Sequence, residues 1–212
     1  MAPPAPWLPK EVHGKPIVAL FVCHSGKVED GEALLAPLRK LGRPLADIVM
    51  RRPYTQMQSL LDATQPKGRR YYWKSHYLAG IDDRMIELAA EHAGRIRSPH
   101  SAILLFQIQG ALNERPAGYS PAGNRNAAYV LNIAGSWESA ADDAANIAWA
   151  RDCFEAARPC STGGTYVNFL TEEEGRERIQ AAYSAADLQK LAALKRKIDP
   201  DNLFSHTKSV AV

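Results

Sequence analysis

The sequence contains no apolar run of about 18 residues, the length that a membrane-spanning helix requires, so no transmembrane helix is predicted. The opening residues, Met-Ala-Pro-Pro-Ala-Pro, provide neither the basic start nor the apolar stretch of a signal peptide. Their prolines favour an extended leader over residues 1–15. Cysteine is scarce, and Cys23, Cys153 and Cys160 form no CxxC pair, which argues against a disulfide framework. These absences predict a cytoplasmic chain in a reducing compartment.

An excess of one charge is also lacking. Lys and Arg number 26 and Asp and Glu number 23, a difference of 3 that does not favour a nucleic-acid partner. The sequence has no Gly-x-Gly-x-x-Gly between a predicted strand and helix, no Gly-rich lysine loop and no HExxH metal motif. Cys23-His24 has no accompanying ligand spacing, so we expect Cys23 to lie in the core and predict no metal site.

Apolar residues make up 46% of the 212 residues, and no linker or repeat forces a division into domains. Runs that alternate or are continuously apolar predict strands, and apolar residues at helical spacing predict helices. The expected strands are residues 16–23, 45–50, 71–78, 101–110, 127–134 and 164–170. The expected helices are residues 31–41, 53–62 and 82–97, one capped by Ser139, one opened by Glu172-Glu173-Glu174, and a last one ended by Asp199-Pro200. Taken alone, this alternation is compatible with a parallel α/β sheet.

Two of the expected strands carry polar or aromatic side chains in a regular order. In the strand at 71–78, Tyr72 and Lys74 share a face that either walls a pocket or packs against neighbouring strands. Gln107 and Gln109 share one side of an apolar strand, where they either touch a polar ligand or face solvent at a sheet edge.

The C-terminal stretch combines a strand signal with a turn signal. On a strand over 164–170, Tyr166 and Asn168 would share one face, where a phenol and a carboxamide can meet a planar polar ligand. After the last helix, Asp199-Pro200-Asp201-Asn202 predicts a turn, and we expect Leu203 and Phe204 to fold back as a plug.

These motifs together resemble those of the berberine bridge enzyme-like flavin oxidases, within the vanillyl-alcohol oxidase superfamily. The resemblance rests on Tyr166-x-Asn168-Phe169, on Asp199-Pro200-x-Asn202-x-Phe204, and on Pro53, Tyr54, Gln58, Asp62, Gly68 and Tyr72-Trp73-Lys74-Ser75. It covers residues 17–205 and matches only the substrate-binding, C-terminal half of that family. It implies an α+β fold, an antiparallel β-sheet with helices packed on one face, over a substrate-binding domain at 16–212. The berberine-bridge-like segment would occupy about residues 165–210.

The resemblance also implies a chemistry, in which FAD accepts a hydride from a small-molecule substrate. By position, Tyr166 and Asn168 would approach the cofactor, and the candidates for substrate binding are Tyr72, Lys74, Gln107, Gln109 and Tyr129. Phe169 stands where the family often has a tyrosine base, so the base is not assigned, and Tyr72, Tyr129 and Tyr166 remain candidates. Thr207 to Val210 depart from the usual Asn-x-Asn-Ile ending.

The resulting prediction is the substrate-binding, C-terminal portion of a FAD-linked oxidase that lacks its own FAD-binding domain. We expect the chain alone not to retain FAD and its partner to be a separate FAD-binding domain or subunit. No nucleic-acid or membrane partner is expected. A homo-oligomer is compatible with this interpretation. The alternative is a stand-alone, non-catalytic α+β binding or scaffold domain derived from such an enzyme.

Overall fold

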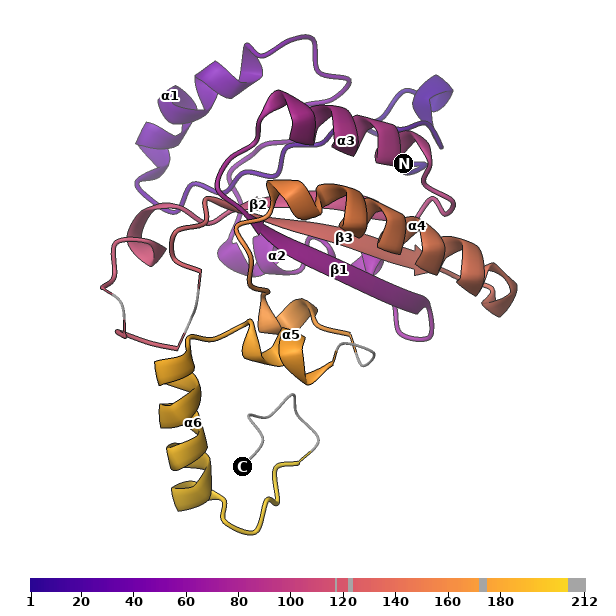
Figure 1. Cartoon of the computed structure of the whole chain (residues 1–212). Helices are drawn as coiled ribbons and strands as arrows, with labels where there is room; N and C mark the ends of the chain where they lie inside the picture. The colour runs from indigo at the N-terminus through magenta and orange to yellow at the C-terminus, as the bar shows by residue number, and fades with distance from the viewer. Residues whose placement is uncertain (117, 122–123, 172–174, 206–212) are drawn as a thin grey trace. The chain divides into compact units, whose positions relative to one another are not determined.

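An antiparallel sheet of three strands forms the centre of residues 70–205 in this computed structural model, which describes residues 1–116, 118–121, 124–171 and 175–205. The strands are β1 (Arg70–Leu78), β2 (Ala102–Gln107) and β3 (Tyr129–Trp137). Their order is β1-β3-β2, so β3 lies in the middle and pairs antiparallel with both neighbours (Figure 1). The strands predicted over 71–78, 101–110 and 127–134 are therefore confirmed, although β2 ends at Gln107 and β3 runs three residues beyond its predicted end at Ala134.

Two helices, α3 (Asp83–Gly94) and α4 (Asp143–Ala157), cover one face of this sheet (Figure 1). The core between them joins Leu78, Leu131 and Ile133 of the sheet to Met85 of α3 and Phe154 of α4. As predicted, the Asp82 side chain caps α3 by accepting a hydrogen bond of 2.8 Å from the Met85 N–H. The α+β architecture implied by the resemblance is confirmed, and the parallel α/β alternative is wrong.

The strand register divides the side chains between two faces, because successive residues of a strand point to opposite sides. The face under α3 and α4 carries Tyr72, Lys74, His76 and Leu78 of β1, with Ile103, Leu105 and Gln107 of β2 and Tyr129, Leu131 and Ile133 of β3. The opposite face carries Tyr71, Trp73, Ser75 and Tyr77 of β1, with Ala102, Leu104 and Phe106 of β2 and Val130, Asn132, Ala134 and Ser136 of β3.

The segment after α4 does not form the strand predicted over 164–170. Instead the chain makes a turn, η6 (Val167–Phe169), in which the Phe169 N–H donates to the Tyr166 carbonyl at 2.9 Å. Gly163 and Gly164 just before it have φ angles of +83° and +72°, a left-handed conformation that breaks an extended strand. The prediction was wrong because a β-prone run becomes a strand only where a neighbouring strand accepts its hydrogen bonds.

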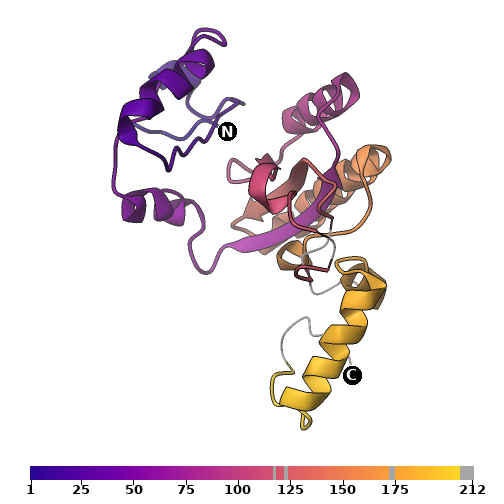
Figure 2. The ribbon, with the colours of Figure 1, turned by 90° about the vertical axis from the view of Figure 1, so that its left-hand side faces the viewer.

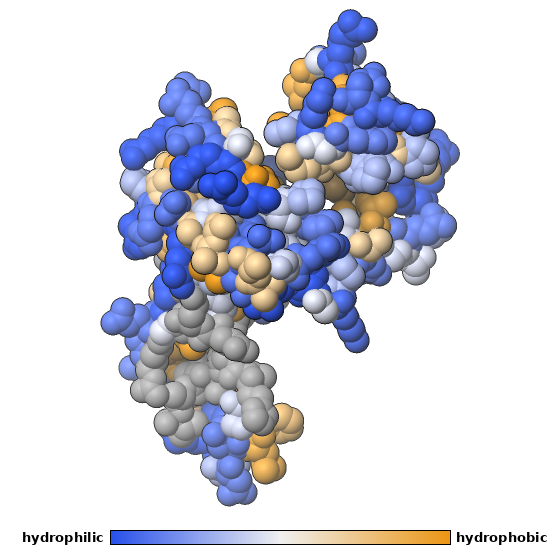
Figure 3. Space-filling view, turned by 90° about the vertical axis from the view of Figure 1, so that its right-hand side faces the viewer, coloured by the Kyte–Doolittle hydropathy of each residue, from blue (hydrophilic) through white to orange (hydrophobic). Residues whose placement is uncertain are grey.

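Two further helices follow, α5 (Arg176–Gln180) and α6 (Ala185–Ile198). As predicted, α6 ends before Asp199, whose carboxylate accepts hydrogen bonds from the Leu203 N–H at 2.8 Å and the Phe204 N–H at 3.1 Å. The side chains do not form the predicted plug, since Leu203 is 78% and Phe204 is 74% exposed. Figure 3 shows apolar side chains in orange near the bottom of the view, beside hydrophilic ones in blue. The predictions for Glu172 to Glu174 and Thr207 to Val210 lie outside the described residues.

Residues 1–69 form a separate compact unit, divided from the sheet unit at Arg69. It contains η1 (Lys10–Val12), α1 (Val28–Arg39), α2 (Tyr54–Gln58) and η2 (Asp62–Thr64), with α1 and α2 seen clearly in Figure 2. Residues 1–15 turn back on themselves, since the Ala2 N–H donates to the Lys15 carbonyl at 2.8 Å, and are therefore not a simple extended leader.

The strands predicted over 16–23 and 45–50 are not formed in this unit. Both runs lack a ladder among the described residues, and Val18 is 94% and Leu20 is 65% exposed. Cys23 is likewise exposed, so its predicted place in the core is wrong. Apolar and β-branched residues favour an extended backbone, but a strand also needs a partner for every N–H and C=O.

No helix among the described residues is long and apolar enough to cross a membrane.

Candidate functional site

The face of the sheet opposite α3 and α4 is lined mainly by neutral aromatic and small polar side chains. The turn η6 lies against this face, because the Phe169 ring contacts Trp73 of β1 edge-on at 6.2 Å and Phe106 of β2 at 6.0 Å between ring centroids. Phe169 also packs against the buried cluster of Tyr77, Ala127 and Val130. Strands that are distant in sequence therefore join the C-terminal segment here, and we refer to this surface with η6 as the aromatic face.

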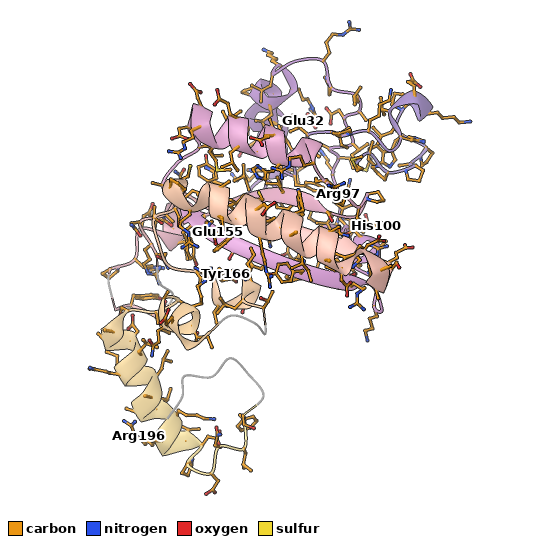
Figure 4. The ribbon with its side chains drawn as sticks, turned by 45° about the vertical axis from the view of Figure 1, so that its right-hand side comes forward. Glu32, Arg97, His100, Glu155, Tyr166 and Arg196 are labelled. Atoms are coloured by element: carbon orange, nitrogen blue, oxygen red, sulfur yellow. The ribbon has the colours of Figure 1, made fainter. Side chains whose placement is uncertain are left out.

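Tyr166 and Asn168, predicted to approach a cofactor, meet each other at this face. The Asn168 Nδ2 donates to the Tyr166 hydroxyl at 2.8 Å, both residues are exposed, and the Tyr166 ring packs edge-on against Phe169 at 5.1 Å. Figure 4 labels Tyr166 on the segment between the sheet and α5. A turn rather than a strand brings the phenol and the carboxamide together, and their role in binding a cofactor stays a prediction.

The aromatic face also holds polar atoms that the sequence analysis did not single out. Within the described residues, Trp73 Nε1, Ser75 Oγ, Asn132 Oδ1 and Ser136 Oγ are buried without a hydrogen-bond partner. Ser75 and Asn132 lie directly opposite each other in the β1–β3 register and are 2% and 3% exposed. A buried polar group that stays unpaired costs about 1–3 kcal/mol, so native structures keep few of them without a reason. An amide on an otherwise apolar strand was the sequence signal that could have revealed Asn132.

The predicted substrate residues of β1 and β3 lie on the other side of the sheet. The Tyr72 hydroxyl accepts a hydrogen bond of 2.9 Å from Arg151 Nε of α4, and Lys74 is buried with its ammonium 5.8 Å from the centroid of the Phe154 ring. Tyr129 packs, half-buried, against the core under the helices. The structure therefore separates these three from Tyr166 and Asn168 by the thickness of the sheet, and their role in substrate binding stays a prediction.

The two glutamines lie at the end of β2. Gln107 Nε2 donates to Gln109 Oε1 at 3.1 Å, and both side chains are exposed. Since β2 is an edge strand, this arrangement fits the solvent-facing alternative as well as contact with a ligand.

Burial shifts the pKa values of three titratable groups in the sheet unit. His76 stacks on Phe154 with 4.1 Å between ring centroids, and burial lowers its pKa to about 4. Burial raises the pKa of the Cys153 thiol to about 12, so this thiol stays protonated and unreactive at neutral pH. Burial also raises the pKa of Tyr77 on the aromatic face. Of the three tyrosines considered as a base, only Tyr166 lies on the side of the aromatic face.

Arg178 of α5 connects η6 to the free edge of β1. Its Nη2 donates to the Ser75 carbonyl at 3.3 Å and to Thr165 Oγ1 at 3.2 Å, and Thr165 is 1% exposed. Because Thr165 directly precedes Tyr166, this side chain fixes where η6 begins.

We expect Arg178→Met to loosen η6 while leaving the sheet folded. The loss of hydrogen bonds from a charged donor should lower the free energy of unfolding by about 1–3 kcal/mol. Amide hydrogen exchange should rise over residues 165–170 and stay unchanged in β3. The matched control is Arg196→Met on the exposed side of α6 (labelled in Figure 4), and an equal effect there would contradict the assigned role of Arg178.

Comparison with known proteins places these features in a class. Residues 165–211 match the sequence profile of the family described as berberine and berberine like. A FAD-linked oxidoreductase of Dictyostelium discoideum is 25% identical over 195 residues, which cover 91% of this chain and 42% of the relative. The (R)-6-hydroxynicotine oxidase of Paenarthrobacter nicotinovorans is 27% identical over 202 residues, which cover 92% of this chain and 44% of the relative. The solved structure of 6-hydroxy-D-nicotine oxidase from Arthrobacter nicotinovorans superposes with a TM-score of 0.71 at 23% identity, over 89% of this chain and 43% of that chain.

The chain matches the C-terminal portion of FAD-linked oxidoreductases, which is the class that the fold and the comparisons define. More particularly, it carries a berberine-bridge-like segment at its C-terminal end, as the Tyr166-x-Asn168 and Asp199-Pro200 motifs predicted. It spans less than half the length of the relatives and of the solved structure that it matches.

Proposed function

We propose that this chain is the substrate-binding portion of a FAD-linked oxidoreductase, completed by a flavin-holding segment on the same or a separate polypeptide. The observation that carries the proposal is the aromatic face, where η6 and three strands bring aromatic rings together with buried polar atoms that have no partner among the described residues. In the relatives named above, the remaining part of the protein is longer than the part that this chain matches.

The residues of the aromatic face fit the ring of a flavin better than its phosphates. Tyr166 and Asn168 offer a phenol and a carboxamide to a planar polar ring. A pyrophosphate instead needs several backbone N–H groups, usually from a Gly-rich turn that opens a helix. The pair Gly163-Gly164 leads only into the three-residue turn η6, so it does not provide such a helix. The nucleotide would therefore be held by the other segment.

When bound, FAD supplies a two-electron acceptor for a hydride, and this chain supplies position and exclusion of water. Trp73 and Phe106, which flank the Phe169 ring, provide apolar walls for a flat substrate. The Tyr166 hydroxyl oxygen accepts a hydrogen bond from Asn168 and is exposed, so it can release its own proton to solvent and then take the proton that the substrate loses with its hydride. Tyr166 is thus the proton-transfer residue we propose, in place of the tyrosine that Phe169 replaces.

The decisive experiment joins this chain to a flavin-holding half. We would replace the matching portion of the Paenarthrobacter nicotinovorans oxidase with residues 1–212 and follow flavin reduction and oxygen consumption over a panel of small aromatic substrates. Substrate-dependent reduction of the flavin would support the proposal. A chimera that folds and binds FAD but never reduces it with any substrate would favour the non-catalytic binding or scaffold domain.

In the active chimera, Asn168→Ala should reduce turnover about 2- to 12-fold, the rate equivalent of one lost hydrogen bond of about 0.5–1.5 kcal/mol. The melting temperature should not change, because Asn168 is exposed and its bond to Tyr166 is local. Asn126→Ala, at an exposed asparagine of a loop, is the control. Unfolding of the chain by Asn168→Ala would show that Asn168 is structural.

A further inference from the structure

The strands contribute only uncharged groups to the aromatic face. The side chains they direct to it are those of Tyr71, Trp73, Ser75, Tyr77, Ala102, Leu104, Phe106, Val130, Asn132, Ala134 and Ser136. None of these strand positions carries a carboxylate, an amine, a guanidinium or an imidazole. Arg178 of α5 does bring a cation to the edge of this face, and its Nη2 donates to the Ser75 carbonyl and to Thr165 Oγ1. A charged ligand buried on the strands themselves would lose its hydration without gaining a counter-ion from them, which is costly.

The polar atoms of the face form a short row across β1 and β3. Ser75 and Asn132 are register partners, and Trp73 lies two residues from Ser75 on the same side. Within the described part of the chain, Trp73 Nε1, Ser75 Oγ and Asn132 Oδ1 have no hydrogen-bond partner, although all three are buried. The row therefore offers one N–H donor, one carbonyl acceptor, and one hydroxyl that can do either.

The ring of Phe169 packs on the same face as this row. It contacts Trp73 edge-on, two residues before Ser75, and packs against the cluster of Tyr77, Ala127 and Val130, in which Tyr77 lies two residues after Ser75. A phenyl ring can make no hydrogen bond with the polar atoms of the row. The group that packs beside the row is itself a neutral six-membered ring, which indicates the size and shape that fit there.

We propose that the aromatic face binds an uncharged, flat, ring-shaped ligand that takes the place of the Phe169 side chain and pairs with Asn132, Ser75 and Trp73. The ligand presents a hydrogen-bond donor to Asn132 Oδ1 and an acceptor to Trp73 Nε1. This proposal names the class of substrate for the proposed function. It rests on that function only where it identifies the ligand of the aromatic face with the substrate. Binding itself needs no flavin, so it is testable on the chain as it stands.

The test uses benzamide as the probe with the full 15N-labelled chain. Benzamide is flat and neutral and carries both an N–H donor and a carbonyl acceptor, whereas benzoate has the same shape with a charge. N,N-dimethylbenzamide lacks the donor. We expect benzamide to shift the indole N–H signal of Trp73, assigned with Trp73→Phe, and to bind at least tenfold more tightly than benzoate, benzylammonium or N,N-dimethylbenzamide.

Asn132→Leu separates a ligand-binding role from a structural one. Leucine has a similar volume and removes the unpaired amide, so the melting temperature should stay the same or rise while benzamide binding weakens at least tenfold. Asn126→Leu is the matched control and should leave binding unchanged. A fall in the melting temperature with unchanged binding would overturn the proposal.

Phe169→Ala gives a second, independent measurement should Asn132→Leu fail to fold. Removal of the competing ring should strengthen benzamide binding several-fold, and unchanged or weaker binding would count against the proposal. Equal binding of benzamide and benzoate, or no binding of benzamide at all, would overturn it. The proposed function is judged separately by the chimera, so substrate-dependent flavin reduction without benzamide binding would reject only this inference.

Discussion

The purified chain of 212 residues is expected to be colourless and to leave added FAD almost entirely in the low-molecular-mass fraction after desalting. The described residues provide surfaces for a flat ring, namely the aromatic face, but no Gly-rich turn that opens a long helix. Without that cradle, the ring contacts alone must offset the cost of ordering a long flexible ligand. Binding of a pyrophosphate relies on several backbone N–H groups that converge on its oxygens.

Absorbance in the flavin bands after desalting, with the protein measured by amino-acid analysis, checks this expectation. The positive control is the chimera with the flavin-holding half of the Paenarthrobacter nicotinovorans oxidase, which should be yellow. Riboflavin, which lacks the pyrophosphate, should bind the isolated chain about as weakly as FAD does. A yellow chain with about one flavin per protein molecule would contradict the expectation and would mean that these residues hold a nucleotide site.

The strands of the sheet were predictable because local and global signals agree there. Residues 71–78 are rich in aromatic residues and residues 127–134 are almost continuously apolar, and the two segments pair antiparallel with each other. Residues 16–23 have an equally strong apolar run, yet remain unpaired and exposed. A strand depends on a partner segment that is distant in the sequence, as β1 and β3 are, and no local pattern encodes that partner.

The sequence predicted that Tyr166 and Asn168 lie together, but it predicted a strand where the structure has a turn. Tyr166 and Asn168 do meet, but through a turn set up by Gly163 and Gly164, which the period-2 pattern cannot represent. The sequence gives no indication of which face of a sheet the helices will cover. For that reason Tyr72 was predicted to bind substrate and Trp73 was not, although Tyr72 lies under the helices and Trp73 lines the aromatic face.

The stability of the sheet unit is expected to fall as the pH drops from 6.5 to about 4, because His76 resists protonation in the folded chain. Its ring is 4% exposed and stacks on Phe154, and its Nε2 donates to the Phe154 carbonyl at 2.9 Å. Burial lowers the pKa first of all, and the positive charges of Arg178 and Arg158 lower it further, while the Phe154 carbonyl and Glu155 act in the opposite direction.

The direction follows from proton counting. Below pH 6.5 the unfolded chain binds a proton at this histidine, whereas folded His76 stays neutral until about pH 4, so acid favours the unfolded state in that window. The pKa of His76 is about 2.5 pH units lower in the folded chain than in the unfolded chain, which corresponds to a loss of about 3 kcal/mol in the free energy of unfolding. The loss is complete once the pH lies below the folded pKa. Carboxylates with lowered pKa values, such as Asp143 and Asp199, add their own loss only at more acidic pH, because their ordinary pKa is 3.8.

Urea unfolding at a series of pH values would measure this dependence, with Trp7→Phe as the background. In that background the remaining tryptophans, Trp73, Trp137 and Trp149, all lie in the sheet unit, so fluorescence reports on that unit alone. His76→Gln should flatten the curve between pH 6.5 and 4, because it removes the group that titrates there. His100→Gln, at a half-exposed histidine of the same unit 3.3 Å from Glu138, is the matched control for the loss of an imidazole. A slope in that window that survives His76→Gln would show that another group, and not the buried imidazole, links acid to unfolding.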